Sequence, residues 1–141
     1  MVDLPTVVCC GDSNTYGAVG STGRRHSRDV RWPGVVARAS ATSPGGGPPA
    51  VRLVAPPPLG TLTIASELWG FGASTATSAG LAPFYREVAA RASAAFLDAG
   101  ALVATDPSDG VHVDPAAHGI LGRAVALAVA GPLPGSSAPA G

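Results

Sequence analysis

Two short polar stretches, near opposite ends of the chain, hold residue types that together can activate a hydroxyl group. The first, "GDSNTYG" at residues 11–17, places Ser13 directly after an apolar run. The second, "DGVHVDP" at residues 109–115, places His112 three residues after Asp109. A serine hydroxyl needs a base to become a useful nucleophile, and the base usually needs a group that orients it. In an Asp-x-x-His loop the carboxylate can meet one imidazole nitrogen, which fixes the tautomer and leaves the other nitrogen free.

Each stretch also has an ordinary structural interpretation. Gly, Asp, Ser and Asn are turn formers, so the first stretch alone could be a loop, and "DGVH" alone is more often a turn than a catalytic pair. A zinc site built from the three histidines with Cys9 and Cys10 lacks a recognisable ligand spacing. The Gly-rich loop lacks the lysine of a phosphate-binding P-loop and the G-x-G-x-x-G of a dinucleotide fold. We therefore expect no metal and no cofactor, and a structural role for His118.

Three apolar runs predict the strands that would position these stretches. "PTVVCC" (5–10) is unbroken and bounded by Pro and Gly, which is typical of a strand buried on both faces of a parallel sheet. "AVRLVAPPP" (50–58) predicts a second buried strand, ended by prolines that cannot donate to a sheet, and "AAFLDAG" (94–100) a third. The polar residues 11–31 between them predict a long loop, and residues 41–49 a linker or turn.

Helical signals alternate with these runs. Residues 32–40 predict a short helix, although Gly34 weakens it, and residues 74–95 a longer one that Pro83 either starts or kinks. The last helix is the best marked, with Asp114 as its N-cap, Pro115 as its first residue and Gly131-Pro132 as its stop. One apolar stripe runs along it: Ala117, Leu121, Ala124, Val125 and Ala128. Strands alternating with helices indicate a layered α/β domain, and parallel strands open their site at the carboxyl edge of the sheet.

Composition limits the classes of partner. The 141 residues are 46% hydrophobic and 13% charged, which suits one modest domain with a buried core. Nine arginines balance nine acids and there is no lysine, so no net charge attracts nucleic acid or an anionic membrane. The basic run at residues 24–31 predicts a solvated surface. The adjacent cysteines do not suit a disulfide with each other, and no segment reaches membrane-spanning length, so we expect a soluble, cytoplasmic protein.

The two polar stretches resemble conserved blocks of one enzyme family. "GDSNTYG" resembles the first block of the GDSL or SGNH hydrolases, and "DGVHVDPAAHGILG" resembles their last block. Between them, "RWPGVVA", "VRLVAPPPLG" and "LAPFYREVAARASAAFLDAG" resemble the arylesterase and acyltransferase branch, so that the resemblance covers most of residues 5–131. It implies that Ser13 is the nucleophile, His112 the general base and acid, and Asp109 the group that orients His112. The implied substrate is a small-molecule short-chain acyl ester, cleaved through an acyl-serine intermediate that is released to water or to an alcohol.

The chain departs from that family in its middle. Two blocks that supply an oxyanion-hole glycine and asparagine are missing, and Asn14 follows the serine too closely to be counted as the asparagine. Losing one oxyanion donor typically costs about 10²–10³ in turnover, so the implied activity is weak. Residues 69–74 ("WGFGAS") are one place where a substitute donor could approach. The alternative is a catalytically impaired, shortened relative that acts as a binding or interaction protein, or has no function.

The same departure affects the expected fold. The resemblance implies a flavodoxin-like three-layer SGNH hydrolase fold whose parallel sheet has the strand order 2-1-3-4-5, here without the second and third strands. The first strand and the strand of residues 50–58 must then pair directly or leave an open gap. We expect one domain over residues 1–131, shortened near 41–49, followed by a disordered tail (132–141). A reduced three-stranded sheet with open edges predicts marginal stability, a homo-oligomer formed through those edges, or aggregation. Trp32 and Trp69 are either walls of the site or core residues.

Overall fold

A computed structural model describes residues 7–39 and 51–130. Its helices and strands follow one another as α1 (Ser13–Tyr16), β1 (Ala18–Val19), η1 (Gly20–Thr22), β2 (Arg24–Arg25), α2 (Trp32–Ala39), β3 (Arg52–Ala55), α3 (Ile64–Ser66), η2 (Glu67–Phe71), α4 (Thr75–Ala79), α5 (Leu81–Arg91), β4 (Ala95–Asp98), η3 (Ala99–Ala101) and α6 (Pro115–Ala130). The linker expected at residues 41–49 and the tail expected at 132–141 lie outside the described residues. Within the described ranges, no helix combines the length and the apolar character needed to cross a membrane.

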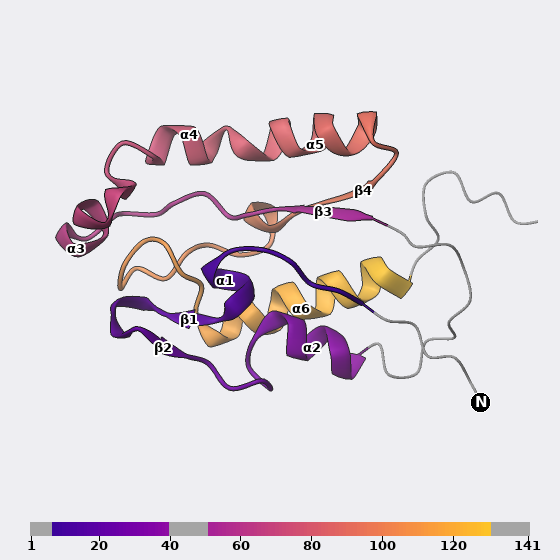
Figure 1. The fold of residues 1–141 in the computed structure, drawn as a ribbon, viewed down its shortest axis with the longest axis horizontal. Helices are drawn as coiled ribbons and strands as arrows, with labels where there is room; N and C mark the ends of the chain where they lie inside the picture. The colour runs from indigo at the N-terminus through magenta and orange to yellow at the C-terminus, as the bar shows by residue number, and fades with distance from the viewer. Residues whose placement is uncertain (1–6, 40–50, 131–141) are drawn as a thin grey trace, which may run out of the picture.

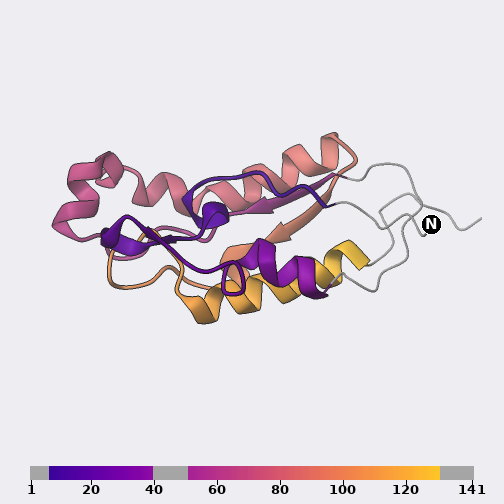
Figure 2. The ribbon, with the colours of Figure 1, turned by 60° about the horizontal axis from the view of Figure 1, so that its bottom comes forward.

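The described elements form three layers (Figure 1). In the middle layer β3 and β4 pair in parallel, with Arg52 opposite Ala95 and Ala55 opposite Asp98. Helix α5 packs on both strands from one side, and α2 and α6 pack against each other on the opposite side (Figure 2). Two parallel strands cannot be joined by a tight turn, and here the segment that contains α3, η2, α4 and α5 makes the crossover. This arrangement confirms the predicted layered α/β fold.

The core lies between the β3–β4 pair and the two helices on its far side. It is built from Trp32 and Val36 of α2, Ala99 of η3, and Leu121 and Val125 of α6, with Val54 and Leu97 of the strands packed against them. Gly122 lets the two helices approach closely, because a Cβ there would lie 2.5 Å from Cβ of Val35. At Gly34 a Cβ would lie 1.7 Å from the carbonyl oxygen of Arg28, so the residue that weakens the helix prediction is required by its packing.

The helix boundaries follow the sequence signals closely. Asp114 caps α6, since its Oδ1 accepts a hydrogen bond from Ala117 N at 2.7 Å, and Pro115 is the first helical residue. The predicted helix of residues 74–95 is two helices separated at Gly80. Pro83 lies in the first turn of α5, where its missing N–H costs no helical hydrogen bond, so it starts that helix and does not kink it.

The predicted first strand is wrong. Residues 7–10 form no strand, and the side chain of Val8 is 78% exposed, although Cys9 packs against the core. A strand that is buried on both faces needs neighbours, and within the described residues none pairs with this segment. Among the described residues the parallel sheet therefore has two strands and not three, and residues 7–10 do not pair with it. A cleft of about 650 Å³ adjoins this segment, lined partly by Cys9, Cys10 and the side of α2.

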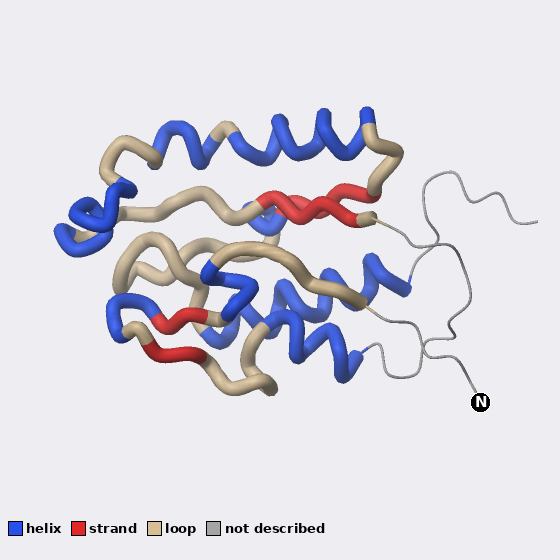
Figure 3. The backbone as a smooth tube through the Cα atoms, viewed as in Figure 1, coloured by secondary structure: helices blue, strands red, loops and turns tan. Residues whose placement is uncertain are grey.

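The expected long loop of residues 11–31 is more structured than its composition suggests. It contains α1 and an antiparallel ladder in which Ala18 pairs with Arg25 and Val19 with Arg24 (Figure 3). Glycine supplies the left-handed conformations that such tight connections need, with φ of +85° at Gly17 and +65° at Gly23. The basic run is mostly exposed, as the sequence predicts.

Candidate active site

Asp109 and His112 form a buried hydrogen-bonded pair. Asp109 Oδ2 lies 2.6 Å from Nδ1 of His112, and the Asp109 side chain is fully buried. Its second oxygen, Oδ1, accepts from the backbone N–H groups of Val111 at 2.8 Å and His112 at 2.9 Å. Burial alone would raise the pKa of Asp109, but these hydrogen bonds from His112 and Val111 outweigh it and hold the pKa below its ordinary value. The carboxylate is therefore ionised and can orient the imidazole, leaving Nε2 as the nitrogen that Asp109 does not engage.

The loop that carries this pair is held from several sides. The carbonyl oxygen of His112 accepts from Asp106 N at 2.6 Å, and Gly110 N donates to the carbonyl of Asp106 at 2.8 Å. Ser66 Oγ donates to the carbonyl of Asp109 at 2.7 Å, which ties the loop to α3. Gly110 has φ of +71°, and a Cβ there would lie 2.3 Å from the carbonyl oxygen of Thr61. The chain therefore requires glycine between the acid and the base.

Ser13 begins α1, and its side chain is exposed. Asp12 caps the helix, since its Oδ1 accepts from Asn14 N at 2.9 Å, as expected for a residue that fixes the turn backbone. Gly17 ends the helix in the left-handed conformation and donates its N–H to the carbonyl of Ser13 at 2.8 Å. The serine therefore stands at the start of a tight, capped turn that is open to solvent.

The fold brings the serine turn against the histidine loop. The side-chain amide of Asn14 accepts from Val113 N at 2.9 Å and donates to the carbonyl of Val111 at 3.3 Å. These bonds place the residue after Ser13 beside the two residues that flank His112. Among the described residues no hydrogen bond joins Ser13 Oγ to His112. In unliganded enzymes such hydrogen bonds are often long and tighten only when substrate binds.

Sequence reasoning considered Asn14 only as a replacement for the oxyanion-hole asparagine, and it missed two further neighbours of the buried pair. Ser66 supports the carbonyl of Asp109, and Gly20 lies so close that a Cβ on it would be 3.3 Å from Asp109 Oδ2. The position of Asn14 next to the serine was the only local signal. Its partners are more than ninety residues away, so no local pattern could identify them.

His118 lies beside this site but is enclosed. It is fully buried, its Nδ1 accepts from Trp32 N at 3.4 Å, and its Nε2 is buried without a hydrogen-bond partner. Its ring meets the ring of His26 edge-on, with 5.2 Å between centroids. Burial, together with the neighbouring charge of His26, lowers the pKa of His118 to about 4. His118 is therefore a neutral, enclosed imidazole, and its structural role stays a prediction.

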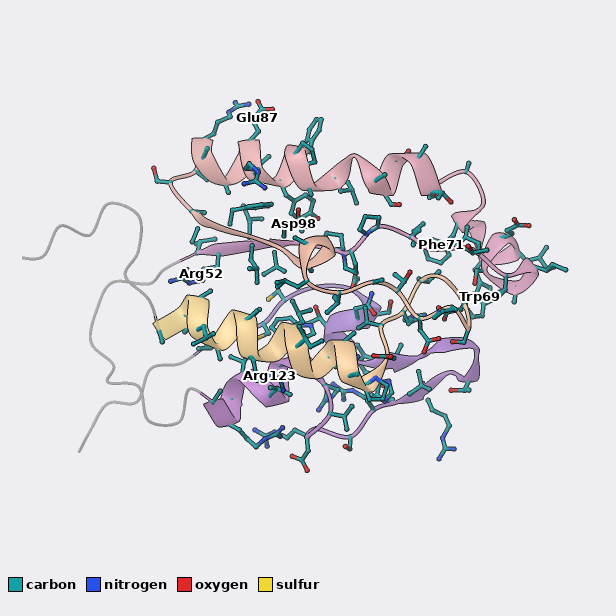
Figure 4. All side chains as sticks on the ribbon, turned by 180° about the vertical axis from the view of Figure 1, so that it is seen from behind. Arg52, Trp69, Phe71, Glu87, Asp98 and Arg123 are labelled. Atoms are coloured by element: carbon teal, nitrogen blue, oxygen red, sulfur yellow. The ribbon has the colours of Figure 1, made fainter. Side chains whose placement is uncertain are left out.

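The two tryptophans have different surroundings. Trp32 belongs to the core, whereas Trp69 is 51% exposed on η2, which lies at one end of the molecule with Phe71 (Figure 4). The described residues contain no group of three or more His, Cys, Asp or Glu side chains that could hold a metal ion.

Comparison with known proteins identifies the fold. No protein-family model and no curated protein matches the sequence. A carbohydrate acetylesterase family member from Sinorhizobium meliloti superposes with a TM-score of 0.75 at 21% identity, covering 86% of this chain and 95% of that one. A putative arylesterase from Agrobacterium tumefaciens str. C58 gives a TM-score of 0.70 at 24% identity, covering 83% and 94%.

A third solved structure agrees with these two. The native M. smegmatis aryl esterase gives a TM-score of 0.74 at 22% identity, covering 86% of this chain and 96% of its own. Identity at this level establishes the architecture and not the reaction. The layers of Figure 1 and the three superpositions show that this chain has a shortened form of the three-layer α/β fold of SGNH-type esterases.

Proposed function

We propose that the protein is a serine ester hydrolase of the SGNH type that acts on short-chain acyl esters. The observation that carries the proposal is the buried Asp109–His112 pair, 2.6 Å apart, with the exposed serine turn tethered to the same loop by Asn14. The structures that superpose on this chain are named as carbohydrate acetylesterases and arylesterases, which supports small acyl groups as substrates.

In the proposed reaction Ser13 is first acylated, and the acyl group is then released from it. Ser13 Oγ bonds to the ester carbonyl carbon while its proton passes to His112 Nε2, and the collapse of the tetrahedral intermediate returns that proton to the departing alcohol. Water then attacks the acyl-serine, gives a proton to His112, and the proton returns to Ser13 Oγ as the acid leaves. An alcohol in place of water gives acyl transfer. Asp109 keeps the imidazole in the tautomer with its proton on Nδ1 and stabilises the imidazolium that forms.

Stabilisation of the oxyanion is the least complete part of this mechanism. The backbone N–H of Ser13 has no hydrogen-bond partner among the described residues and is available to the developing negative charge. One of the two N–H groups of the Asn14 amide donates to the carbonyl of Val111, which leaves at most the other for an oxyanion. Because each absent donor typically costs about 10²–10³ in turnover, we expect slow hydrolysis.

A second candidate is a shortened relative that binds a partner and does not catalyse. The lack of a hydrogen bond between Ser13 Oγ and His112, and the unpaired segment 7–10, favour it. Labelling with a fluorophosphonate separates the two candidates, because the reagent reacts with a serine that an imidazole activates. The test compares the parent, Ser13→Ala, His112→Ala and a control, Ser27→Ala, which removes another exposed serine.

Stoichiometric labelling of the parent and of Ser27→Ala, with none in Ser13→Ala and slow labelling in His112→Ala, would support the hydrolase. A parent that circular dichroism shows to be folded, but that remains unlabelled, would support the binding protein. Labelling that survives in Ser13→Ala would contradict the assignment of the nucleophile.

A further inference from the structure

The side chain of Asn14 binds the backbone around His112 in the way a strand binds its neighbour. In a parallel ladder, one residue donates to the carbonyl before its partner and accepts from the N–H after it. Asn14 Nδ2 donates to the carbonyl of Val111, and Asn14 Oδ1 accepts from the N–H of Val113, so the partner in this pattern is His112. The amide therefore takes the position of a peptide group in a strand next to His112.

The backbone of His112 itself is fixed by other residues. Its N–H donates to Asp109 Oδ1 at 2.9 Å, and its carbonyl accepts from Asp106 N at 2.6 Å. Those two bonds come from within the loop, and they position the imidazole relative to Asp109. They do not connect His112 to the serine turn. Asn14 makes that connection, through its hydrogen bonds to Val111 and Val113 on either side of His112.

The connection matters because the other bonds of the serine turn do not reach the histidine loop. The carbonyl of Tyr16 accepts from Arg25 Nε at 2.7 Å and the carbonyl of Gly17 accepts from His26 N at 2.8 Å, both within residues 16–26. Residues 7–10, which lead into it, belong to no strand, and Val8 is largely exposed. Within the described chain, the two bonds of Asn14 are the only hydrogen bonds between residues 7–22 and residues 105–114. Gly20 adds only a van der Waals approach to Asp109.

We propose that Asn14 is a positioning residue, which sets the distance between Ser13 and His112 through the backbone on either side of the histidine. This inference rests on the proposed hydrolase function for its kinetic consequence, but the juxtaposition that it describes can be measured without turnover. Misplacement of a reacting group by about 1 Å can cost about 10²-fold in rate. A side chain that fixes the nucleophile relative to its base should therefore affect the chemical step much more than substrate binding.

The experiment compares the parent with Asn14→Ala, Asn14→Asp and Ser78→Ala. The Ser78→Ala variant is the matched control, because Ser78 is a buried serine whose hydroxyl also makes two hydrogen bonds, one from Leu59 N and one to the carbonyl of Thr75, away from the site. For each variant we would measure thermal stability, the fluorophosphonate labelling rate of folded protein, kcat and KM on an aryl acetate, and nuclear Overhauser contacts between the Ser13 β-protons and the His112 ring.

We expect Asn14→Ala to lower the labelling rate and kcat about 10- to 100-fold with little change in KM, and to weaken the Ser13–His112 proton contacts. Ser78→Ala should lose stability and keep the parent's labelling rate. Asn14→Asp retains the acceptor for Val113 N–H but turns an oxygen toward the carbonyl of Val111. It should therefore lose rate as Asn14→Ala does, despite its almost identical shape.

The outcomes separate this inference from the proposed function. If the parent is labelled, and Asn14→Ala is labelled equally fast per folded molecule with the proton contacts intact, Asn14 does not position the pair. The same conclusion follows if Asn14→Asp keeps the parent's rate. If the parent is never labelled but its Ser13–His112 proton contacts are present and weaken in Asn14→Ala, the hydrolase proposal fails while the positioning role stands.

Discussion

The two halves of the candidate site are built differently. The acid–base half, residues 105–114, is mostly buried apart from residues 107 and 108. Hydrogen bonds to Asp109, His112 and Gly110 hold it, and it leads directly into the capped helix α6. The nucleophile half, residues 7–17, is mostly exposed and begins with residues 7–10, which pair with no strand among the described residues. The acid–base half is therefore enclosed and hydrogen-bonded from several sides. Among the described residues, the two bonds of the Asn14 side chain are what join the nucleophile half to it.

This difference shows which part of the site a shortened α/β domain can preserve. The Asp109–His112 pair is local in sequence, so three residues of spacing and the backbone between them bring the two side chains together, and Ser66 of α3 supports the loop from outside. A nucleophile on a turn after a strand is positioned by that strand, and a strand needs neighbours. Here the neighbours are absent among the described residues, and the turn retains its own cap but loses the support of a sheet.

The largest effects on activity are expected from replacing His112 or Asp109. Replacing His112 or Asp109 by Ala should lower hydrolysis of an aryl acetate by about 10²–10⁴-fold, because the serine loses its base or the base loses its orientation. The measurement is steady-state turnover, with His26→Ala as a control in which a histidine outside the pair is removed. Rates that stay at the parent level in both variants would contradict the assigned roles.

Weakening the packing of α6 against α2 tests how much this helix pair contributes to the free energy of unfolding. Leu121 of α6 is a core residue, and Leu121→Ala should lower the free energy of unfolding by about 2–5 kcal/mol. Leu127→Ala is the matched control, because Leu127 lies on the same helix but is 76% exposed, and it should change stability by no more than about 0.5 kcal/mol. Urea unfolding followed by circular dichroism measures both. Equal losses would mean that α6 does not pack on α2 as described.

Acid should weaken the fold through His118. Its pKa is about 4 when folded and takes the ordinary value of 6.5 when unfolded, so the unfolded chain binds the proton first as the pH falls. The stabilising contribution is complete above about pH 6.5 and is lost between there and pH 4, on the order of 3 kcal/mol. The urea midpoint of the parent should fall across this window, and that of His118→Gln should fall less. An identical slope in the two proteins would show that His118 is not the titrating group.

The smallest effect is expected in the segment that precedes the serine. Val8→Ser should change the free energy of unfolding by no more than about 0.5 kcal/mol, because the side chain is already in contact with solvent. Urea unfolding at one pH is sufficient. A loss of more than about 1 kcal/mol would mean that the Val8 side chain is buried, and the segment before the serine would then be packed more like the histidine loop.

Local chemistry predicted most of the parts. Asp114 and Pro115 marked the start of α6, and Asp109 and His112 were recognisable as a pair because three residues of spacing suffice to join them. The strand predicted at residues 5–10 was wrong, because an unbroken apolar run forms a buried strand only if other strands flank it. Trp32 and Trp69 could not be told apart by residue type, and only the fold separates a core tryptophan from an exposed one.

The sequence by itself determined the chemical groups, namely an exposed hydroxyl on a capped turn and an acid–imidazole pair three residues apart, because each is made by contacts within a few residues. Tertiary structure decided whether these groups meet. The amide of Asn14 reaches Val111 and Val113 across most of the chain, and α2 packs against α6 across a similar separation in sequence. Such contacts depend on how distant segments share hydrogen bonds and a buried core, and no local pattern specifies that.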